Sequence, residues 1–141
     1  MAYDSNNIFA KILRGEAPCI KIYEDDETLA FMDLMPQAPG HVLVIPKEPA
    51  ETLLDLSEAA AVACIRSTRR VAIAVKQALG VAGVAVAQFN GAAAGQTVPH
   101  CHFHVIPQDT GVALRMHAAV RAPQEALEAM AARIRPHLQP A

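Results

Sequence analysis

The sequence predicts an α+β domain built on an antiparallel sheet, and three observations lead to this fold class. The chain has 141 residues, of which 52% are hydrophobic, so it can form one domain with a substantial core. Its apolar patterns follow the order helix, three strands, helix, two strands, helix. The strands form hairpin-like neighbours with few crossover units, which favours an antiparallel sheet. We expect one domain over 1–141, with a core of about 5–110 and a C-terminal helix and tail over about 111–141.

Five segments have the composition of strands. The acidic stretch "EDDE" between the first two predicts a hairpin turn, and Pro36, Pro39 and Gly40 predict a loop before the third. Pro46 and Pro107 end the third and fifth segments. The expected strands are 19–24, 28–33, 41–46, 84–90 and 100–107.

Three segments have helical spacing. The first helix is expected to begin near residues 5–7 and to stop at Gly15. The long second helix is expected to be capped by Asp55 or Ser57, in a capping-box pattern with Glu58, and to end at Gly80. The last helix is expected over 123–135. The apolar stripe of the long helix consists of Leu56, Ala60, Cys64, Thr68, Val71, Val75 and Leu79.

Composition argues against several classes of protein. A net charge of −2 gives no reason to expect a nucleic acid as partner. No apolar run reaches the roughly 18 residues of a membrane helix, and the N-terminus lacks a signal-peptide pattern, so we expect the cytoplasm. Cys19, Cys64 and Cys101 are odd in number and unclustered, which predicts reduced thiols rather than a disulfide framework.

The stretch "PHCHFHVIP" (99–107) carries the strongest functional signal. Side chains alternate between the two faces of a strand, which rises about 3.3 Å per residue. One face of this strand is therefore expected to be polar and the other apolar. The polar face would hold His100, His102 and His104, and the apolar face Cys101, Phe103 and Val105.

Three interpretations of the histidines compete: a solvated sheet face, a metal site, and nucleophilic catalysis by a neutral imidazole. The preceding loop "NGAAAGQT" helps to decide between them. Its small residues let backbone N–H groups approach an anion, and Asn90, Gln96 and Thr97 add neutral donors. Such a loop suits phosphate better than a divalent cation, so phosphoryl or nucleotidyl chemistry is favoured.

The segment "HCHFHVI" (100–106) resembles the signature of the histidine triad (HIT) family, His-x-His-x-His followed by two apolar residues. The likeness extends back to "NIFAKILRGEAPCIKIYEDDETLAFMDLMPQAPGHVLVIPK" and is strongest to the Hint-like branch and its bacterial relatives. It implies a HIT-like fold: a five-stranded antiparallel sheet, one long helix, a short N-terminal helix and a C-terminal helix. It also implies a homodimer whose two sheets form one ten-stranded sheet.

The resemblance further implies hydrolysis of nucleoside monophosphate derivatives, such as AMP or GMP phosphoramidates, without a metal or cofactor. His102 would be the nucleophile and form a covalent nucleotidyl-histidine. His104 would contact the phosphate and the departing group, His100 would support His102 through its backbone carbonyl, and His41 would join the cluster. Two alternatives stay open: a nucleotide-binding regulatory or scaffold protein with little turnover, and a metal-dependent hydrolase.

Further site residues follow from the resemblance. The ribose hydroxyls would be held by Asp33, whose other interpretation is a turn residue at a strand end. For Ile12 and Phe31, the alternative to a base pocket is ordinary core. By this match the phosphate contacts are Asn90, Gln96 and Thr97, and the base pocket is Phe9, Ile12, Phe31 and Leu34.

The chain departs from the family pattern in two places. Many bacterial relatives carry Cys-x-x-Cys at the first helix as part of a zinc site, but this chain has Asn7 and Ala10 there, so we predict no zinc at that place. The tail lacks Trp and ends in "RIRPHLQPA", which leaves the leaving group open. His117 and His137 have no motif around them and are expected at the surface.

Overall fold

Five strands form one antiparallel sheet in the order β1-β2-β3-β5-β4 in the computed structural model, which describes residues 2–116 and 120–138. This arrangement confirms the α+β prediction. The strands are β1 Lys21–Glu24, β2 Thr28–Met32, β3 Val42–Pro46, β4 Gly83–Gln88 and β5 Phe103–Gln108. The helices are α1 Ile8–Leu13, α2 Glu58–Leu79 and α3 Gln124–Ile134, with 3₁₀ turns at Ala92–Ala94 and Arg135–His137.

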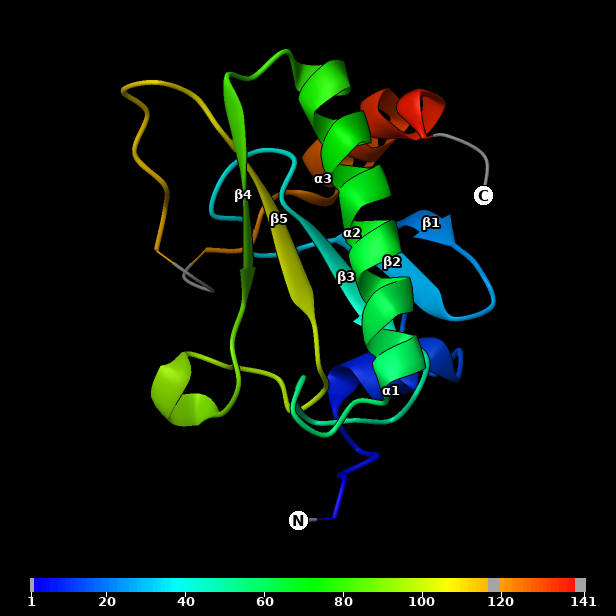
Figure 1. Ribbon diagram of the computed structural model, residues 1–141. Coiled ribbons are helices and arrows are strands. Elements are labelled where there is room, and N and C mark those ends of the chain that lie inside the picture. The colour runs from blue at the N-terminus through cyan, green and yellow to red at the C-terminus, as the bar shows by residue number, and fades with distance from the viewer. Residues whose placement is uncertain (1, 117–119, 139–141) are drawn as a thin grey trace.

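Helices α2 and α3 cover one face of the sheet (Figure 1). Because strand residues alternate between faces, every second side chain of β2, β3 and β5 points at these helices. The predicted stripe of α2 faces this core, which confirms it. The core contains Ala30, Met32, Val42, Val44, Phe103 and Val105 from the sheet, Cys64, Val71 and Val75 from α2, and Leu127, Ala131 and Ile134 from α3.

A second apolar cluster lies on the opposite face, where α1 packs against the sheet. It consists of Phe9 from α1 with Leu29, Phe31, Leu43 and Ile45. Strands β2 and β3 are therefore buried on both faces, which explains their nearly continuous apolar sequence. The two histidines that follow the same alternation, His102 and His104, face this second side.

The ends of the helices follow their caps. Asn7 caps α1, since its side chain accepts a hydrogen bond from the Ala10 N–H, and Ser57 caps α2 in the same way through Ala60. Asp55 does not cap α2, because its carboxylate binds Thr52 in the preceding turn. Gly80 ends α2 in the left-handed conformation, with φ of 64°.

The predicted last strand begins three residues later than expected, at Phe103 rather than His100. Pro99 has no N–H to donate, and the N–H of His100 turns back to the carbonyl of Val98. The Cys101 N–H then donates to Ala50 O, outside the sheet. The expectation that all three histidines share one face of a strand is therefore wrong, because His100 and His102 precede β5 and His104 lies within it.

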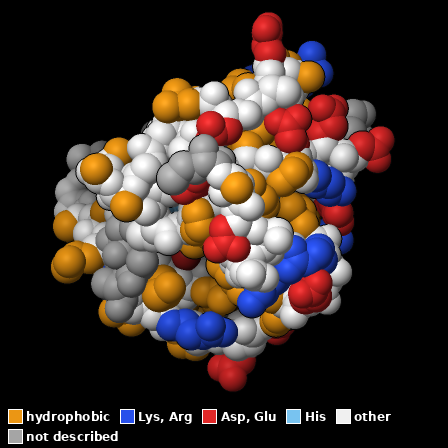
Figure 2. Space-filling view, turned by 90° about the horizontal axis from the view of Figure 1, so that it is seen from below, with side chains coloured by type: hydrophobic (Ala, Val, Ile, Leu, Met, Phe, Trp, Pro, Cys, Tyr) orange, Lys and Arg blue, Asp and Glu red, His pale blue; other side chains and the backbone are white. Residues whose placement is uncertain are grey.

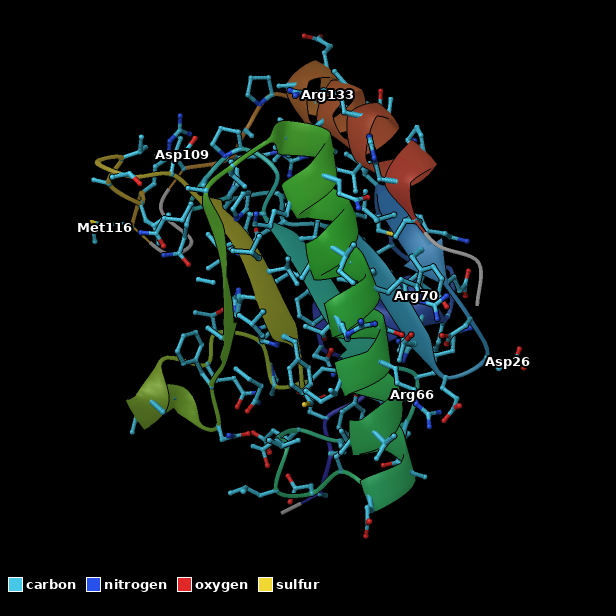
Figure 3. All side chains as sticks on the ribbon, turned by 45° about the horizontal axis from the view of Figure 1, so that its top comes forward. Asp26, Arg66, Arg70, Asp109, Met116 and Arg133 are labelled. Atoms are coloured by element: carbon cyan, nitrogen blue, oxygen red, sulfur yellow. The ribbon has the colours of Figure 1, made fainter. Side chains whose placement is uncertain are left out.

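The surface is mixed in character. Acidic, basic and apolar side chains are interspersed on the face that Figure 2 shows, in keeping with the net charge of −2. Arg70 of α2 lies over the ring of Tyr23 in β1, 5.2 Å from its centroid, while Asp109 and Met116 lie at the other side of the molecule, after β5 (Figure 3). Within the described ranges 2–116 and 120–138, no helix is long and apolar enough to span a membrane.

Candidate active site

A pocket of about 380 Å³ lies between α1 and the face of β2, β3 and β5 that is turned away from α2. It is mainly apolar, with polar groups at one end. Many of the predicted site residues meet here although they are far apart in sequence. Those that line the pocket are Phe9, Ile12, Phe31, Asp33, Leu34, Thr97, His102 and His104.

His102 is held in one tautomer by its neighbour. Its Nδ1 lies 2.7 Å from the carbonyl oxygen of His100. A carbonyl oxygen can only accept, so Nδ1 carries the proton, and Nε2 of the neutral ring keeps its lone pair. The N–H of the same peptide group, that of Cys101, donates to Ala50 O at 2.8 Å, which fixes the plane of the accepting carbonyl.

His104 is oriented by a second chain of hydrogen bonds. The backbone N–H of Gln37 donates to His41 Nδ1 at 3.1 Å, so neutral His41 carries its proton on Nε2. That Nε2 lies 3.0 Å from His104 Nδ1 and donates to it. His104 then carries its own proton on Nε2. The two pocket histidines thus differ: His102 offers a lone pair through Nε2, and His104 offers a donor.

His100 lies beneath the pocket rather than in it. Its ring is fully buried, with Nε2 2.9 Å from Pro46 O and Nδ1 2.5 Å from the Tyr3 hydroxyl. Burial lowers the pKa of His100 from its ordinary value of 6.5, although the bond to Pro46 acts in the opposite direction. This histidine is therefore neutral and serves the site through its backbone carbonyl.

Asp33 lies at the polar end of the pocket. Its Oδ1 accepts the N–H of Met35 at 2.8 Å, and its Oδ2 lies 3.5 Å from His41 Nε2. The N–H of Met35 thus fixes the side chain as in a strand-end turn, and the carboxylate also borders the pocket. Asp33 can therefore hold the turn at the strand end and at the same time contact a molecule bound in the pocket.

Asp33, His41 and His104 bring one ligand atom each within 4.8 Å of one another, the spacing of a metal site. The donor set does not fit a cation. A neutral imidazole that binds metal through Nε2 needs its proton on Nδ1, but the Gln37 N–H already points at Nδ1 of His41. At the first helix, Asn7 and Ala10 offer no thiolate, and the Asn7 amide is bonded to Tyr3 and Asp4.

The glycine-containing loop before the histidines is braced by its own side chains. The amide of Gln96 accepts from the Gly91 N–H at 2.7 Å and donates to Glu51 O at 2.6 Å and Val98 O at 2.9 Å. Asn90 accepts from the Leu53 N–H at 2.8 Å. Both amides therefore hold the loop in shape. Of the three predicted phosphate contacts, Thr97 is the one that lines the pocket.

Sequence reasoning missed some residues at this site. Tyr3 precedes the first predicted element, and Arg121 follows a segment without periodicity, yet Tyr3 binds His100 and Arg121 borders the pocket. No motif marks either. Cys101 stands between two of the histidines, but burial raises the pKa of its thiol to about 12, so it supplies no thiolate nucleophile. His137 is half-buried, and His117 lies outside the described residues.

Comparison with known proteins identifies one family. The HIT domain model matches residues 14–111. The chain is 41% identical over 101 residues to adenosine 5'-monophosphoramidase hnt1 of Schizosaccharomyces pombe, covering 72% of this chain and 73% of that protein. It is 40% identical over 101 residues to adenylylsulfatase HINT3 of Arabidopsis thaliana, covering 72% of this chain and 51% of that protein.

Solved structures show the same likeness. A Hit-like protein from Bartonella henselae, described as involved in cell-cycle regulation and crystallised with an unknown ligand, superposes with a TM-score of 0.93 at 48% identity. The match covers 98% of this chain and 100% of that one. With the family model over most of the chain, the histidine signature and this fold, the protein belongs to the HIT domain family.

Proposed function

We propose that the protein is a nucleotide hydrolase or transferase that cleaves the bond between the α-phosphorus of a nucleoside monophosphate and a leaving group. The observation that carries the proposal is the hydrogen bond from His102 Nδ1 to His100 O at 2.7 Å. It places the proton of a pocket-lining imidazole on Nδ1, so Nε2 is the nitrogen that would attack.

The shape and lining of the pocket support the proposal that it binds a nucleotide. Its apolar part is bounded by Phe9 and Phe31, whose rings are 5.4 Å apart in an edge arrangement, and by Ile12 and Leu34. A planar purine fits such a wall. Asp33, at the polar end, can accept hydrogen bonds from both ribose hydroxyls. The α-phosphate would then lie beside the two pocket histidines, whose ring centroids are 5.0 Å apart.

The proposed reaction has two steps. In the first, the lone pair of His102 Nε2 forms a bond to the α-phosphorus while the bond to the leaving group breaks. His104 Nε2–H donates a hydrogen bond to the departing atom or a phosphate oxygen, and an amine leaving group takes a proton from water. In the second, the resulting hydroxide attacks phosphorus, the phosphorus–nitrogen bond to His102 breaks, and AMP is released. No metal takes part.

The relatives support the choice of substrate class. Two of them are named as an AMP phosphoramidase and an adenylylsulfatase, and both names describe cleavage of an AMP derivative. We therefore propose AMP or GMP derivatives as substrates, with an amine as the leaving group to test first.

We also propose that the protein acts as a cytoplasmic homodimer. β4 forms one end of the sheet, and Val86 in its middle is 52% exposed. Pairing of two β4 strands would produce a ten-stranded sheet and satisfy an open edge. The three cysteines are free thiols, which suits a reducing compartment.

Turnover of a fluorogenic adenosine phosphoramidate tests the proposal. We expect wild-type protein and the control His137→Ala, a change outside the pocket, to hydrolyse it equally well with chelator present, and His102→Ala to lose at least about 10³-fold in kcat. Turnover by His102→Ala at the wild-type rate would refute the mechanism. Binding of AMP without turnover by wild-type protein would instead indicate a nucleotide-binding regulatory protein.

A further inference from the structure

A network of hydrogen bonds, part-buried at Tyr3 and buried at His100, joins the N-terminal segment to the first histidine of the triad. Pro46 O can only accept, so His100 Nε2 carries the proton and Nδ1 holds a lone pair. The hydroxyl of Tyr3, 2.5 Å away, must therefore donate to Nδ1. The Asn7 amide in turn donates to the Tyr3 oxygen at 2.8 Å. The direction of every bond is thus fixed from one end to the other.

The network continues into the proposed nucleophile. His100 is fully buried and is held at both ring nitrogens, and its backbone carbonyl accepts the Nδ1–H of His102. Phe9 packs beside both rings, with centroid distances of 6.4 Å to His100 and 5.0 Å to His102. A change in the first ring is therefore passed to the second through one peptide group and one shared neighbour.

We propose that Tyr3 is a positioning residue for the reaction: its hydroxyl fixes the tautomer and place of His100 and, through the carbonyl of His100, the tautomer of His102. Asn7 has the supporting role of orienting the Tyr3 hydroxyl while it also caps α1. This inference rests on the proposed function, because it concerns the same nucleophile. It assigns a role in that chemistry to a segment that precedes the first helix.

Removal of the Tyr3 hydroxyl should lower kcat rather than weaken nucleotide binding. In Tyr3→Phe the buried Nδ1 of His100 loses its donor, so the ring can exchange tautomer or turn away from Pro46. His102 then populates the tautomer that carries its proton on Nε2, which cannot attack. Because Tyr3 does not line the pocket, nucleotide binding should change little. We expect kcat to fall about tenfold and KM to stay within about twofold.

The chain offers a matched control, since it has two tyrosines. Tyr23 also donates its hydroxyl to a side chain, that of Asp25, but this pair lies between β1 and α2, away from the pocket. Tyr23→Phe removes the same atom and should leave kcat unchanged. Asn7→Ser keeps a cap acceptor for α1 but removes the amide donor to Tyr3, and we expect a smaller loss in kcat, about two- to threefold.

The test combines kinetics with ¹⁵N NMR of the imidazole nitrogens, at a temperature where all variants are folded. The proposal predicts an Nε2–H tautomer for His100 in wild-type protein and in Tyr23→Phe, and in Tyr3→Phe a shift of the Nδ1 resonance together with the loss in kcat. An unchanged Nδ1 resonance, or a kcat within twofold of wild type, would overturn it. If Tyr3→Phe does not fold, Asn7→Ser decides by NMR: a shifted His100 Nδ1 resonance supports the proposal, and an unchanged one overturns it.

Failure of the proposed function would appear differently. In that case wild-type protein shows no turnover and no nucleotidyl adduct, and a positioning role in catalysis falls with it. The NMR comparison would still report whether Tyr3 fixes the His100 tautomer. If wild-type protein turns over normally and Tyr3→Phe has no effect, the inference about Tyr3 is refuted but the proposed function is not.

Discussion

Gln96 provides a sharp test of how the loop before the histidines is built. Its amide makes three hydrogen bonds, one accepted from Gly91 and two donated to the carbonyls of Glu51 and Val98. Gln96→Glu preserves the shape of the side chain and the acceptor. It replaces the amide donor, however, with an oxygen that faces two carbonyl oxygens.

The expected loss of stability in Gln96→Glu follows from those contacts. Each lost hydrogen bond costs about 0.5–1.5 kcal/mol, and a charged oxygen buried beside two carbonyls adds more, so we expect the free energy of unfolding to fall by about 2–5 kcal/mol. Average unfolding entropies put the entropy of a chain of this length at about 0.3 kcal/mol per kelvin. The melting temperature should therefore fall by about 7–17 °C.

Thermal unfolding followed by circular dichroism measures the effect. Gln77→Glu, which makes the same change at an exposed position on α2, is the control and should shift the melting temperature by less than about 3 °C. A Gln96→Glu protein that melts within about 2 °C of wild type but has lost kcat would refute the bracing role. That result would favour Gln96 as a direct phosphate contact.

Three further predictions concern the histidines and the sheet edge. His41→Phe removes the donor to His104, so kcat should fall about three- to tenfold in steady-state assays. His41→Gln should retain more activity than His41→Phe. Equal rates for the two variants would contradict the assigned order of tautomers from His41 to His104. Burial lowers the pKa of His100 in the folded state, so below about pH 6.5 the unfolded state binds more protons than the folded state. The free energy of unfolding should therefore be full above that pH and should fall as the pH drops below it. Urea unfolding at about pH 7.5 and about pH 5.5 should show this loss, and His100→Gln should reduce it; an equal loss in both proteins would exclude His100 as its source. Val86→Glu places like charges across the proposed β4–β4 contact and should turn a dimer into a monomer by analytical ultracentrifugation; a dimer of unchanged affinity would place the interface elsewhere.

Much of the fold could be predicted because its signals are local. The stripe of α2, its Gly80 end and the Ser57 cap depend on residues within a few positions of one another. The alternation at residues 101–105 likewise predicts which side chains enter the core, and Cys101, Phe103 and Val105 do so. The predicted start of the last strand was wrong because the true start depends on a distant partner. The carbonyl of Ala50 accepts the Cys101 N–H and draws the chain out of the sheet before Phe103.

The site likewise combines residues that the sequence predicts with contacts that it does not predict. The pocket unites Asp33, Thr97 and the two histidines His102 and His104 as the family likeness implies. The bracing role of Gln96 could not be predicted, because its partner Glu51 is 45 residues away and a polar side chain beside a glycine suits either phosphate or backbone. The contact of Tyr3 with His100 spans 97 residues and has no motif.

The central claim is that His102 forms a covalent bond to the α-phosphorus. Brief incubation of the protein with an adenosine phosphoramidate, rapid acid-free quenching and peptide mass spectrometry would test it most directly. The account predicts an AMP adduct on the His102 imidazole, present in wild-type protein and in His104→Ala and absent from His102→Ala. Normal turnover with no adduct, or an adduct that persists in His102→Ala, would contradict it.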